Sequence, residues 1–410
     1  MSFNIALSGL RTTSQDLNTI SHNIANVSTP GFRGARSEFS AVYAGGQPGG
    51  VTMANVSQNF DAEGDIMYTG RQLDMAISGN GFFVTENGGS MSYSRAGMFQ
   101  MDKDGYIVDA YGGVLQGYPV GANGQLLTGS TGGLRIDNGA LPASATENIR
   151  MGLNLDSRNE DLIAADFDPT DPESYHALNS TKVYDSLGNE HNLTQYYIKT
   201  ADNTWEVKYE LDGVDISPYV NGGAGHTITF DSNGSMTSGG NPSFDIPNTL
   251  TDADGNSIFN GAANLAMDLD MSNATQFGSE FAVASMTQDG YTAGELSGIR
   301  VDDNGMVYGV YTNGQDQLQG QVVMANFPNP NGLQQTNNTA WTATFSSGQP
   351  VMGAAGTGTL GSLYSGGIEG SNVDLTGELV NLMTAQRNYQ SNSKVISTQN
   401  QLTQALFQAI

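Results

Sequence analysis

The sequence contains no cysteine and only four histidines. Without cysteine the chain can form neither a disulfide framework nor a thiolate zinc site. Imidazole chemistry has few candidates, which are dispersed along the chain: His22, His176, His191 and His226. A chain of 410 residues is long enough to bury a core without metal or disulfide crosslinks.

Cations are also scarce, because 15 Lys and Arg residues stand against 41 Asp and Glu, for a formal net charge of -26. Phosphate backbones and anionic lipids would repel such a chain, so we expect neither nucleic acid nor a membrane as a partner. Arg11 is the first cation, and no long apolar run occurs. We therefore expect no signal peptide and no transmembrane helix. The chain should stay in the cytoplasm or be exported by a route that reads no such signal.

Apolar residues near the N-terminus recur every seven positions, with a second set three positions later: Phe3, Leu10, Leu17 and Ile24, then Ala6, Thr13, Ile20 and Val27. This spacing is the a/d pattern of a coiled-coil helix. The pattern ends at residues 28–31, where Pro30 and Gly31 supply a helix stop.

The C-terminus has a similar pattern. Ser371 and Asp374 have capping-box spacing, which predicts a helix that begins near Asn372. The expected seam of this helix contains a first group and, after a change of register, a second: Leu375, Leu379, Leu382, Gln386 and Tyr389, then Val395, Gln399, Leu402, Leu406 and Ala409.

Neither helix can bury its apolar stripe alone, and isolated helices need partners to be stable in water. We therefore expect the two ends to pair with each other and with copies of the chain. The expected partners of Leu10, Leu17 and Ile24 are Leu375, Leu382 and Leu402. The alternative is that both helices pack on the central part of the chain.

The centre of the chain has the pattern of β-structure. Trp205, Val207, Tyr209 and Leu211 alternate with charged residues, which predicts a half-buried strand. Asp-x-x-Gly recurs through this part of the chain, and at Asp102, Asp185, Asp231, Asp252 and Asp302 the spacing favours type I turns that close hairpins. The 53 glycines fit a body with many tight turns.

Composition also predicts where domains begin and end. Glycine-rich segments at 44–50 and 353–367 indicate flexible joints, and 145–180 indicates entry into an inserted domain. The predicted fold is mainly β, with nested, discontinuous domains and paired terminal helices. The expected limits are 1–30 with 372–410 for the helices, 31–70 with 361–371 for linkers, 71–145 with 285–360 for one β domain, and 146–284 for an inserted outer β domain.

No catalytic, cofactor or metal site is predicted. Residues 252–263 resemble a calcium loop, but Gly255 is at the fourth place and Ala263 replaces the bidentate Glu, so a turn is favoured. Asp61, Glu63 and Asp65 are carboxylates without a feature that selects a hydrolytic pair. Neither a Gly-x-Ser-x-Gly elbow nor a phosphate loop is present. The sequence indicates a protein that is not an enzyme.

Both ends resemble the signatures of the flagellar rod, hook and hook–filament junction proteins. The N-terminal resemblance is carried by residues 8–10, 20–26 and 29–33, and the C-terminal one by residues 371–375, 378–380 and 386–390. The matching positions that we single out are Asn23, Asn26, Pro30, Gly31, Phe32, Asn372, Asp374, Gln386 and Arg387. Residues 79–83, 93–97 and 115–118 are similar to the core that rod and hook proteins share. Residues 167–175, 183–188 and 289–294 are similar to hook proteins in particular.

The resemblance implies a subunit that polymerises with identical copies into a curved, flexible tube, a universal joint between motor and filament that flagellar motility requires. The terminal helices would form an inner layer around an export channel, with β domains outside. Implied partners are rod proteins, the hook cap, the hook–filament junction protein and the flagellar type III export apparatus, and the implied location is the flagellum outside the cell. We expect the ends to be disordered in the free monomer.

Two alternatives remain open from the sequence. One is another axial subunit of the same family, such as a distal rod or junction protein. The other is an extracellular β-rich module that binds calcium or glycans.

Overall fold

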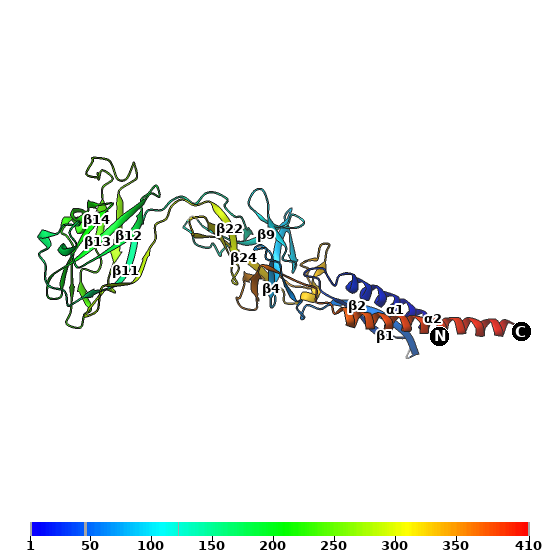
Figure 1. The fold of residues 1–410 in the computed structure, drawn as a ribbon. Helices are drawn as coiled ribbons and strands as arrows, with labels where there is room; N and C mark the ends of the chain where they lie inside the picture. Colours follow the sequence, from blue (N-terminus) through cyan, green and yellow to red (C-terminus); the bar gives the residue numbers. More distant parts are fainter. Residues whose placement is uncertain (1, 45–46, 122, 409–410) are drawn as a thin grey trace. The chain divides into compact units, whose positions relative to one another are not determined.

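The computed structural model describes residues 2–44, 47–121 and 123–408. The chain divides into two compact units. The first contains Met1–Asn138, Gly298–Val310 and Asp316–Ile410, and the second contains Gly139–Ser297 and Tyr311–Gln315. The predicted fold class is confirmed, because strands dominate the chain and its two ends are helices that pack against each other (Figure 1).

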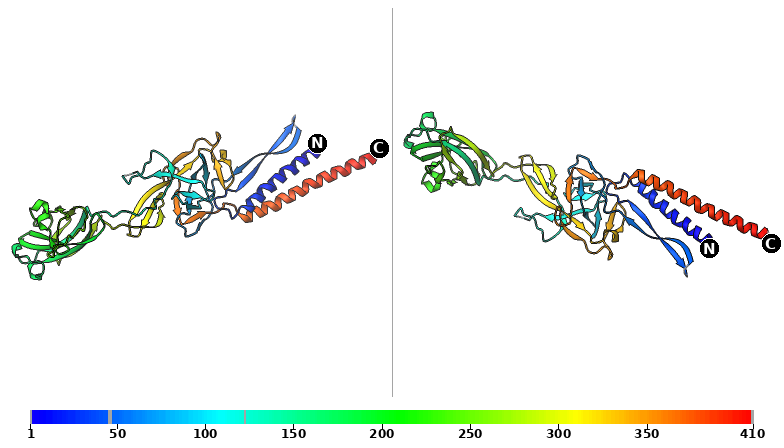
Figure 2. Two further views of the ribbon diagram at one scale, coloured as in Figure 1. Left: turned by 90° about the horizontal axis from the view of Figure 1, so that it is seen from above. Right: turned by 90° about the horizontal axis from the view of Figure 1, so that it is seen from below.

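The terminal part of the first unit contains two helices and a two-stranded ribbon. Helix α1 is Ser2–Ala25 and helix α2 is Leu375–Gln408. The ribbon pairs β1 (Ala35–Ala44) with β2 (Gln47–Gln58) in antiparallel register and packs on α1. Both views of Figure 2 show α1 and α2 side by side, with α2 continuing past the N-terminal end of α1.

The rest of the first unit is built on a twelve-stranded sheet, whose main path runs β22-β23-β24-β9-β5-β6-β26-β25. The strands on this path are β22 (Leu296–Val301), β23 (Met306–Tyr311), β24 (Asp316–Asn326), β9 (Val114–Pro119), β5 (Phe82–Asn87), β6 (Ser90–Ser94), β26 (Ala340–Thr342) and β25 (Gln334–Gln335). The strands beside it are β7 (Phe99–Met101), β8 (Ile107–Asp109), β10 (Gly132–Gly133) and β27 (Val351–Ala354). The short 3-10 helix η5 is Pro330–Gly332.

Two small strand pairs join distant parts of the chain next to this sheet. Strand β3 (Ile66–Tyr68) pairs with β29 (Gly367–Glu369), and β4 (Met75–Ser78) pairs with β28 (Ser362–Ser365). A cluster of aromatic residues forms part of the core, in which Phe60 and Phe82 both pack edge-on against the fully buried Trp341.

The second unit contains two sheets around a core of its own. The strands of the first sheet are β11 (Asn148–Asp156), β18 (Ser243–Ile246), β19 (Leu265–Asp270), β20 (Thr275–Phe277) and β21 (Ala282–Gln288). Those of the second are β12 (Ala177–Tyr184), β13 (Glu190–Ala201), β14 (Thr204–Leu211), β15 (Val214–Asp215), β16 (Thr227–Phe230) and β17 (Met236–Ser238). Four 3-10 turns complete the unit: η1 (Ala164–Asp166), η2 (Pro172–Ser174), η3 (Ser217–Tyr219) and η4 (Asn221–Gly223).

The predicted strand and turns are confirmed. Strand β14 buries Trp205, Val207, Tyr209 and Leu211, as the alternation requires. In each of the five Asp-x-x-Gly segments singled out above, the glycine N–H donates to the carbonyl of the aspartate, at 2.9–3.2 Å: Gly105, Gly188, Gly234, Gly255 and Gly305. The Asp252 carboxylate accepts the N–H groups of Asp254 and Asn256, so it caps its own turn.

Three local expectations differ from the structure. Helix α2 begins at Leu375 rather than near Asn372, because Asp374 is its N-terminal cap. The glycine-rich segment 44–50 lies within the β1–β2 ribbon, although residues 45–46 are outside the described residues. The segment 353–367 carries β28 and the ends of β27 and β29. Main-chain pairing therefore orders much of what composition marks as flexible.

Candidate functional site: the terminal helix pair and its joint

The two terminal helices run antiparallel. Asn23 of α1 donates from Nδ2 to Oε1 of Glu378 at 3.0 Å. Near the other end of α1, a Cβ added to Gly9 would lie 2.9 Å from the side chain of Asn392. The absence of a side chain at Gly9 therefore permits close approach, and the two contacts fix the register of the pair.

This register tests the expected partners within one chain. Position 23 faces 378 and position 9 faces 392, so residues near 402 lie beyond the N-terminal end of α1. The expectation that Leu402 pairs with Leu10, Leu17 or Ile24 of its own chain is therefore wrong.

The predicted seam residues lie in different environments on the two helices. On α1, Ile20 is buried and Leu10, Leu17 and Ile24 are half-buried. On α2, Leu382 is half-buried, whereas four others are 38–56% exposed: Leu375, Leu379, Tyr389 and Leu402. The side chain of Leu406 lies outside the described residues. The apolar stripe of α2 is thus largely uncovered in the single chain.

Asn23 and Asn372 use their side-chain amides to fasten helices to the backbone of other elements. Asn23 accepts the N–H of Ala35 at 2.9 Å and donates to its carbonyl at 2.7 Å, so it pairs with β1 as a neighbouring strand would. Asn372 accepts the N–H of Gly34 at 2.8 Å and donates to the carbonyls of Asn59 and Ala62 at 2.8 and 2.9 Å. These contacts satisfy backbone groups where regular pairing ends.

The other signature residues have distinct placements. Asn26 donates to the carbonyl of His22 and accepts from the hydroxyl of Thr29, which shapes the turn after α1. Phe32 is buried and its ring lies 5.4 Å from that of His22, whereas Pro30 is half-buried. Gln386 and Arg387 are exposed on α2.

A buried ionic cluster joins the helical part to the sheet of the same unit. Glu369 binds Arg33 at 2.7 Å and Arg95 at 3.2 Å, and all three side chains are at most 3% exposed. Arg95 also donates to the carbonyls of Ile77 and Gly79. Burial lowers the pKa of Arg95 to about 10, although the charge on Glu369 opposes the change. Arg95 therefore remains charged at neutral pH.

The pairing of charges in this cluster was not foreseen from the sequence. Arg33 and Arg95 lie in the family-like segments 29–33 and 93–97, but nothing there identifies Glu369 as their common partner. The one sequence feature that could have drawn attention to Glu369 is its position as the single charged residue in the glycine-rich stretch 366–370. Breaking a buried ion pair costs about 3–5 kcal/mol of folding free energy. Glu369 therefore strongly stabilises the connection between the helical part and the sheet.

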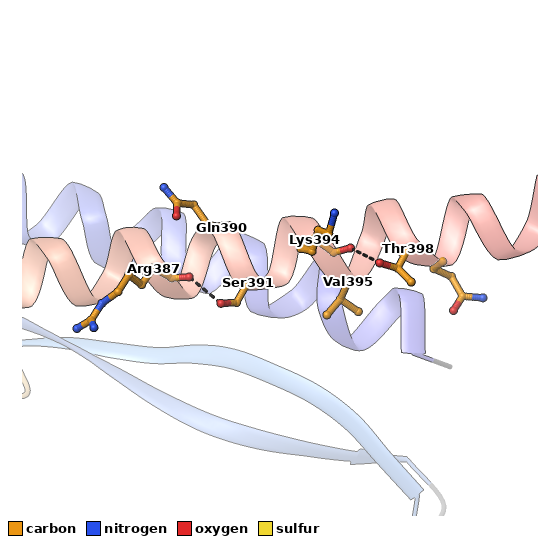
Figure 3. A pocket seen from close by; sticks show the side chains of 7 residues that line it. Arg387, Gln390, Ser391, Lys394, Val395 and Thr398 are labelled. Atoms are coloured by element: carbon orange, nitrogen blue, oxygen red, sulfur yellow. Dashed lines mark hydrogen bonds between the residues drawn. The ribbon is translucent and has the colours of Figure 1, made fainter.

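Helix α2 presents another face opposite the one that meets α1. Arg387 and Lys394 lie two positions after Ala385 and Asn392, which face α1, and two positions on a helix turn the side chain by about 200°. Figure 3 shows these two cations along a shallow hollow of about 810 Å³, which Gln390, Ser391, Val395, Thr398 and Gln399 also line. Six of the seven residues that line this hollow are polar or charged, and Val395 is the exception.

The described residues contain neither a metal-binding cluster nor a membrane-spanning helix. Among them, no group of three His, Cys, Asp or Glu residues is placed to hold a metal ion. In the same part of the chain, no helix is long and apolar enough to cross a membrane.

Family models match four stretches of the chain. They are the flagella basal body rod protein at 3–33, the flagellar hook protein FlgE/F/G D1 domain at 76–151, the flagellar basal body protein FlaE D2 domain at 154–291, and the flagellar basal body rod FlgEFG protein C-terminal model at 364–409. The flagellar hook protein FlgE of Escherichia coli K12 is 39% identical over 414 residues, covering 99% of each chain. The chain belongs to the FlgE family of flagellar hook proteins.

Other members of the hook family agree. FlgE of Salmonella typhimurium is also 39% identical over 99% of each chain, and FlgE of Rhizobium meliloti is 30% identical over 98% of this chain and 96% of its own. The crystal structure of Helicobacter pylori hook protein FlgE2 has a TM-score of 0.52, with 15% identity, over 73% of this chain and all of that one. This structural similarity supports the fold described above.

Membership of the hook family gives the chain its place. It is a structural subunit of the bacterial flagellar hook, as the resemblance of its ends predicted. The two terminal family models cover the two terminal helices, the asparagines Asn23 and Asn372 that bond to the backbone of other elements, and the ion pair of Arg33 with Glu369. The joint described above therefore lies in the segments that identify the family.

Proposed function

We propose that this chain polymerises with identical copies into a curved, flexible tube that serves as a universal joint between rod and filament in flagellar motility. The observation that carries the proposal is the uncovered apolar stripe of α2, in which Leu379 and Leu402 are 45% and 56% exposed. An apolar stripe on a helix needs a partner surface in water. The partner is the helix pair of neighbouring copies.

In this proposal the molecule is layered. The helices at 1–30 and 372–410 form the inner wall around an export channel, and residues 31–70 and 361–371 connect them to the β domains. Residues 71–145 with 285–360 form the middle layer, and residues 146–284 form the outer domain. The terminal helices become fully ordered when they pack against other copies, as coupled folding and assembly would produce.

The protein acts by mechanics rather than catalysis, with no cofactor or metal. Its protein partners are rod proteins at one end of the tube and the hook cap or junction protein at the other, and the flagellar type III apparatus exports it. The net charge of -26 supports the exclusion of nucleic acid and membranes as partners.

The proposal is tested with full-length protein in which Leu379 and Leu402 are replaced by Asn. Each leucine buried on assembly contributes roughly 1.5–3 kcal/mol, so the double variant should raise the critical concentration for tube formation at least tenfold. The matched control is Leu178→Asn, because Leu178 has the same 45% exposure as Leu379 but lies in the second unit.

Sedimentation and negative-stain images give the readout. Wild-type protein should form curved tubes of even diameter, and the control should differ little from it. Straight rods or no polymer from wild type would contradict the proposed function. If the double variant and the control assembled equally well, the apolar stripe of α2 would not be part of the interface between copies.

A further inference from the structure

An acidic groove of about 880 Å³ lies among α1, β1 and the start of α2. Its acidic lining residues are Asp16, Glu38, Asp61, Asp374 and Glu378, and its one lining cation is Arg36. Arg36 is already paired with Glu38 at 3.3 Å. Among the described residues, the other four carboxylates have no cation within ion-pair distance.

Two of these carboxylates are partly removed from water. Oε1 of Glu378 accepts from Asn23, but Oε2 is buried and has no hydrogen-bond partner in the described chain. Burial raises the pKa of Asp16; a hydrogen bond with Ser37 opposes the rise and the nearby charge of Glu378 adds to it. A buried acceptor without a partner is costly, so the groove is incomplete in the isolated chain.

The same helices carry three cations without an internal ion pair. Within the described residues, Arg11, Arg387 and Lys394 form no salt bridge, although Arg387 donates to the hydroxyl of Thr384 at 3.3 Å. Arg387 and Lys394 line a separate hollow on α2, and although Arg387 touches Thr384 at the rim of the acidic groove, neither cation pairs with a carboxylate of its own groove in the described chain. Only 15 cations serve a chain with 41 acids, so leaving these unpaired in an assembly of like-charged copies would be unfavourable.

We infer that Arg387 and Lys394 of one copy bind the acidic groove of a neighbouring copy, at Asp374 and Glu378, and thereby set the axial register of adjacent α2 helices. The occupant is a second copy because charge complementarity on one chain supplies both halves of the contact. The inference rests on the proposed polymerisation and adds to it an ionic contact beside the apolar stripe.

The helix geometry makes the contact specific. Asp374 precedes Arg387 by 13 residues, and Glu378 precedes Lys394 by 16. At 1.5 Å per residue, a parallel α2 helix displaced by roughly 20–24 Å along the axis brings both cations to both carboxylates. The ionic contact thus determines the axial displacement between neighbouring α2 helices. A stripe of repeating leucines defines this displacement less sharply, because it can pack in more than one register.

A double-mutant cycle tests the contact in full-length protein. Arg387→Glu with Lys394→Glu should raise the critical concentration for tube formation roughly tenfold or more, because attraction becomes repulsion. Glu378→Gln keeps the acceptor for Asn23 but removes the charge, and should raise it about threefold. In the Glu378→Gln background, the two reversals should cost several-fold less than in wild type, since their repulsive partner is gone.

The control is Lys103→Glu, an exposed residue outside the helices whose pairing with Asp104 is on the surface. It should assemble within about twofold of wild type. Circular dichroism of each monomer excludes loss of helix as the cause. Wild-type protein that forms no tube would overturn the proposed function and this contact together. Tubes from wild type and from the reversed variant at equal concentration, or additive effects in the cycle, would overturn the contact alone.

Discussion

At the scale of single residues, two asparagines replace regular pairing where the chain leaves a helix or enters one. Asn23 pairs with both backbone groups of Ala35, and Asn372 bonds three backbone groups from two segments. An amide can do this because it carries both donors and an acceptor. These two signature positions therefore act within the chain, while the exposed apolar residues of α2 are left for other copies.

Replacing Asn372 with Ala should destabilise the first unit by about 1–3 kcal/mol, because the N–H of Gly34 and the carbonyls of Asn59 and Ala62 lose their partner. Urea unfolding would be followed through Trp341, in a Trp205→Phe background, so that the signal comes from the first unit. Asn400→Ala is the control, since Asn400 is exposed on α2. Equal unfolding midpoints for the two variants would show that the hydrogen bonds of Asn372 contribute nothing to the stability of the first unit.

At the scale of elements, the turn after α1 controls how the helix meets the sheet. Gly31 has φ of +69° and its N–H donates to the carbonyl of Glu369 at 2.8 Å. A Cβ at Gly31 would lie 2.4 Å from the backbone nitrogen of Ala96. The position therefore requires glycine both for its conformation and for the space.

Gly31→Ala should destabilise the first unit by more than the about 1–2 kcal/mol that a left-handed conformation costs an L-residue. Gly88→Ala isolates that cost, because Gly88 has φ of +57° and no atom within 4 Å of an added Cβ. Thermal unfolding of both variants gives the comparison, and we expect a clearly larger loss at Gly31. A loss no larger than at Gly88 would mean that the turn yields without disturbing Ala96.

The elements differ in how far the sequence alone predicts them. Strand β14 and the five Asp-x-x-Gly turns follow from local pattern, because alternation and turn chemistry act over a few residues. The β1–β2 ribbon was not predicted, because its glycine-rich segment reads as a joint while its order comes from cross-strand pairing and from α1. The bonds of Glu369 to Arg33 and Arg95 join chain segments 336 and 274 residues apart, respectively, and no local pattern contains them.

The same reasoning applies to the candidate assembly surface. The apolar positions of α2 are visible in the sequence, but which of them face α1 depends on a register that Gly9 and Asn23 set through contacts with Asn392 and Glu378. The seam residues lie on the two helices, and their role in assembly stays a prediction, while the pairing of Leu402 with α1 of its own chain does not fit this register.

At the scale of the whole molecule, the two units have separate cores and different ionisable groups. Each core contains one of the two tryptophans, Trp341 in the first unit and Trp205 in the second. Three of the four histidines lie in the second unit: His176, His191 and His226. Trp341→Phe and Trp205→Phe variants thus report the unfolding of the second and first unit respectively.

Acidification from pH 7 to pH 5 should destabilise the second unit more than the first. Burial lowers the pKa of both His176 and His226 below the ordinary 6.5. The neutral His226 accepts from Tyr209 at 2.6 Å and donates to the carbonyl of Gly239 at 2.6 Å, so a second ring proton would break the bond with Tyr209. Because the unfolded state binds protons more readily in this range, the stability that the neutral histidines contribute is present above pH 6.5 and is lost as the pH falls through the lowered pKa values.

Unfolding midpoints of the two single-tryptophan variants across this pH range give the measurement. Adding His176→Gln to the variant that reports the second unit should flatten its slope, and equal slopes for the two units would contradict the prediction.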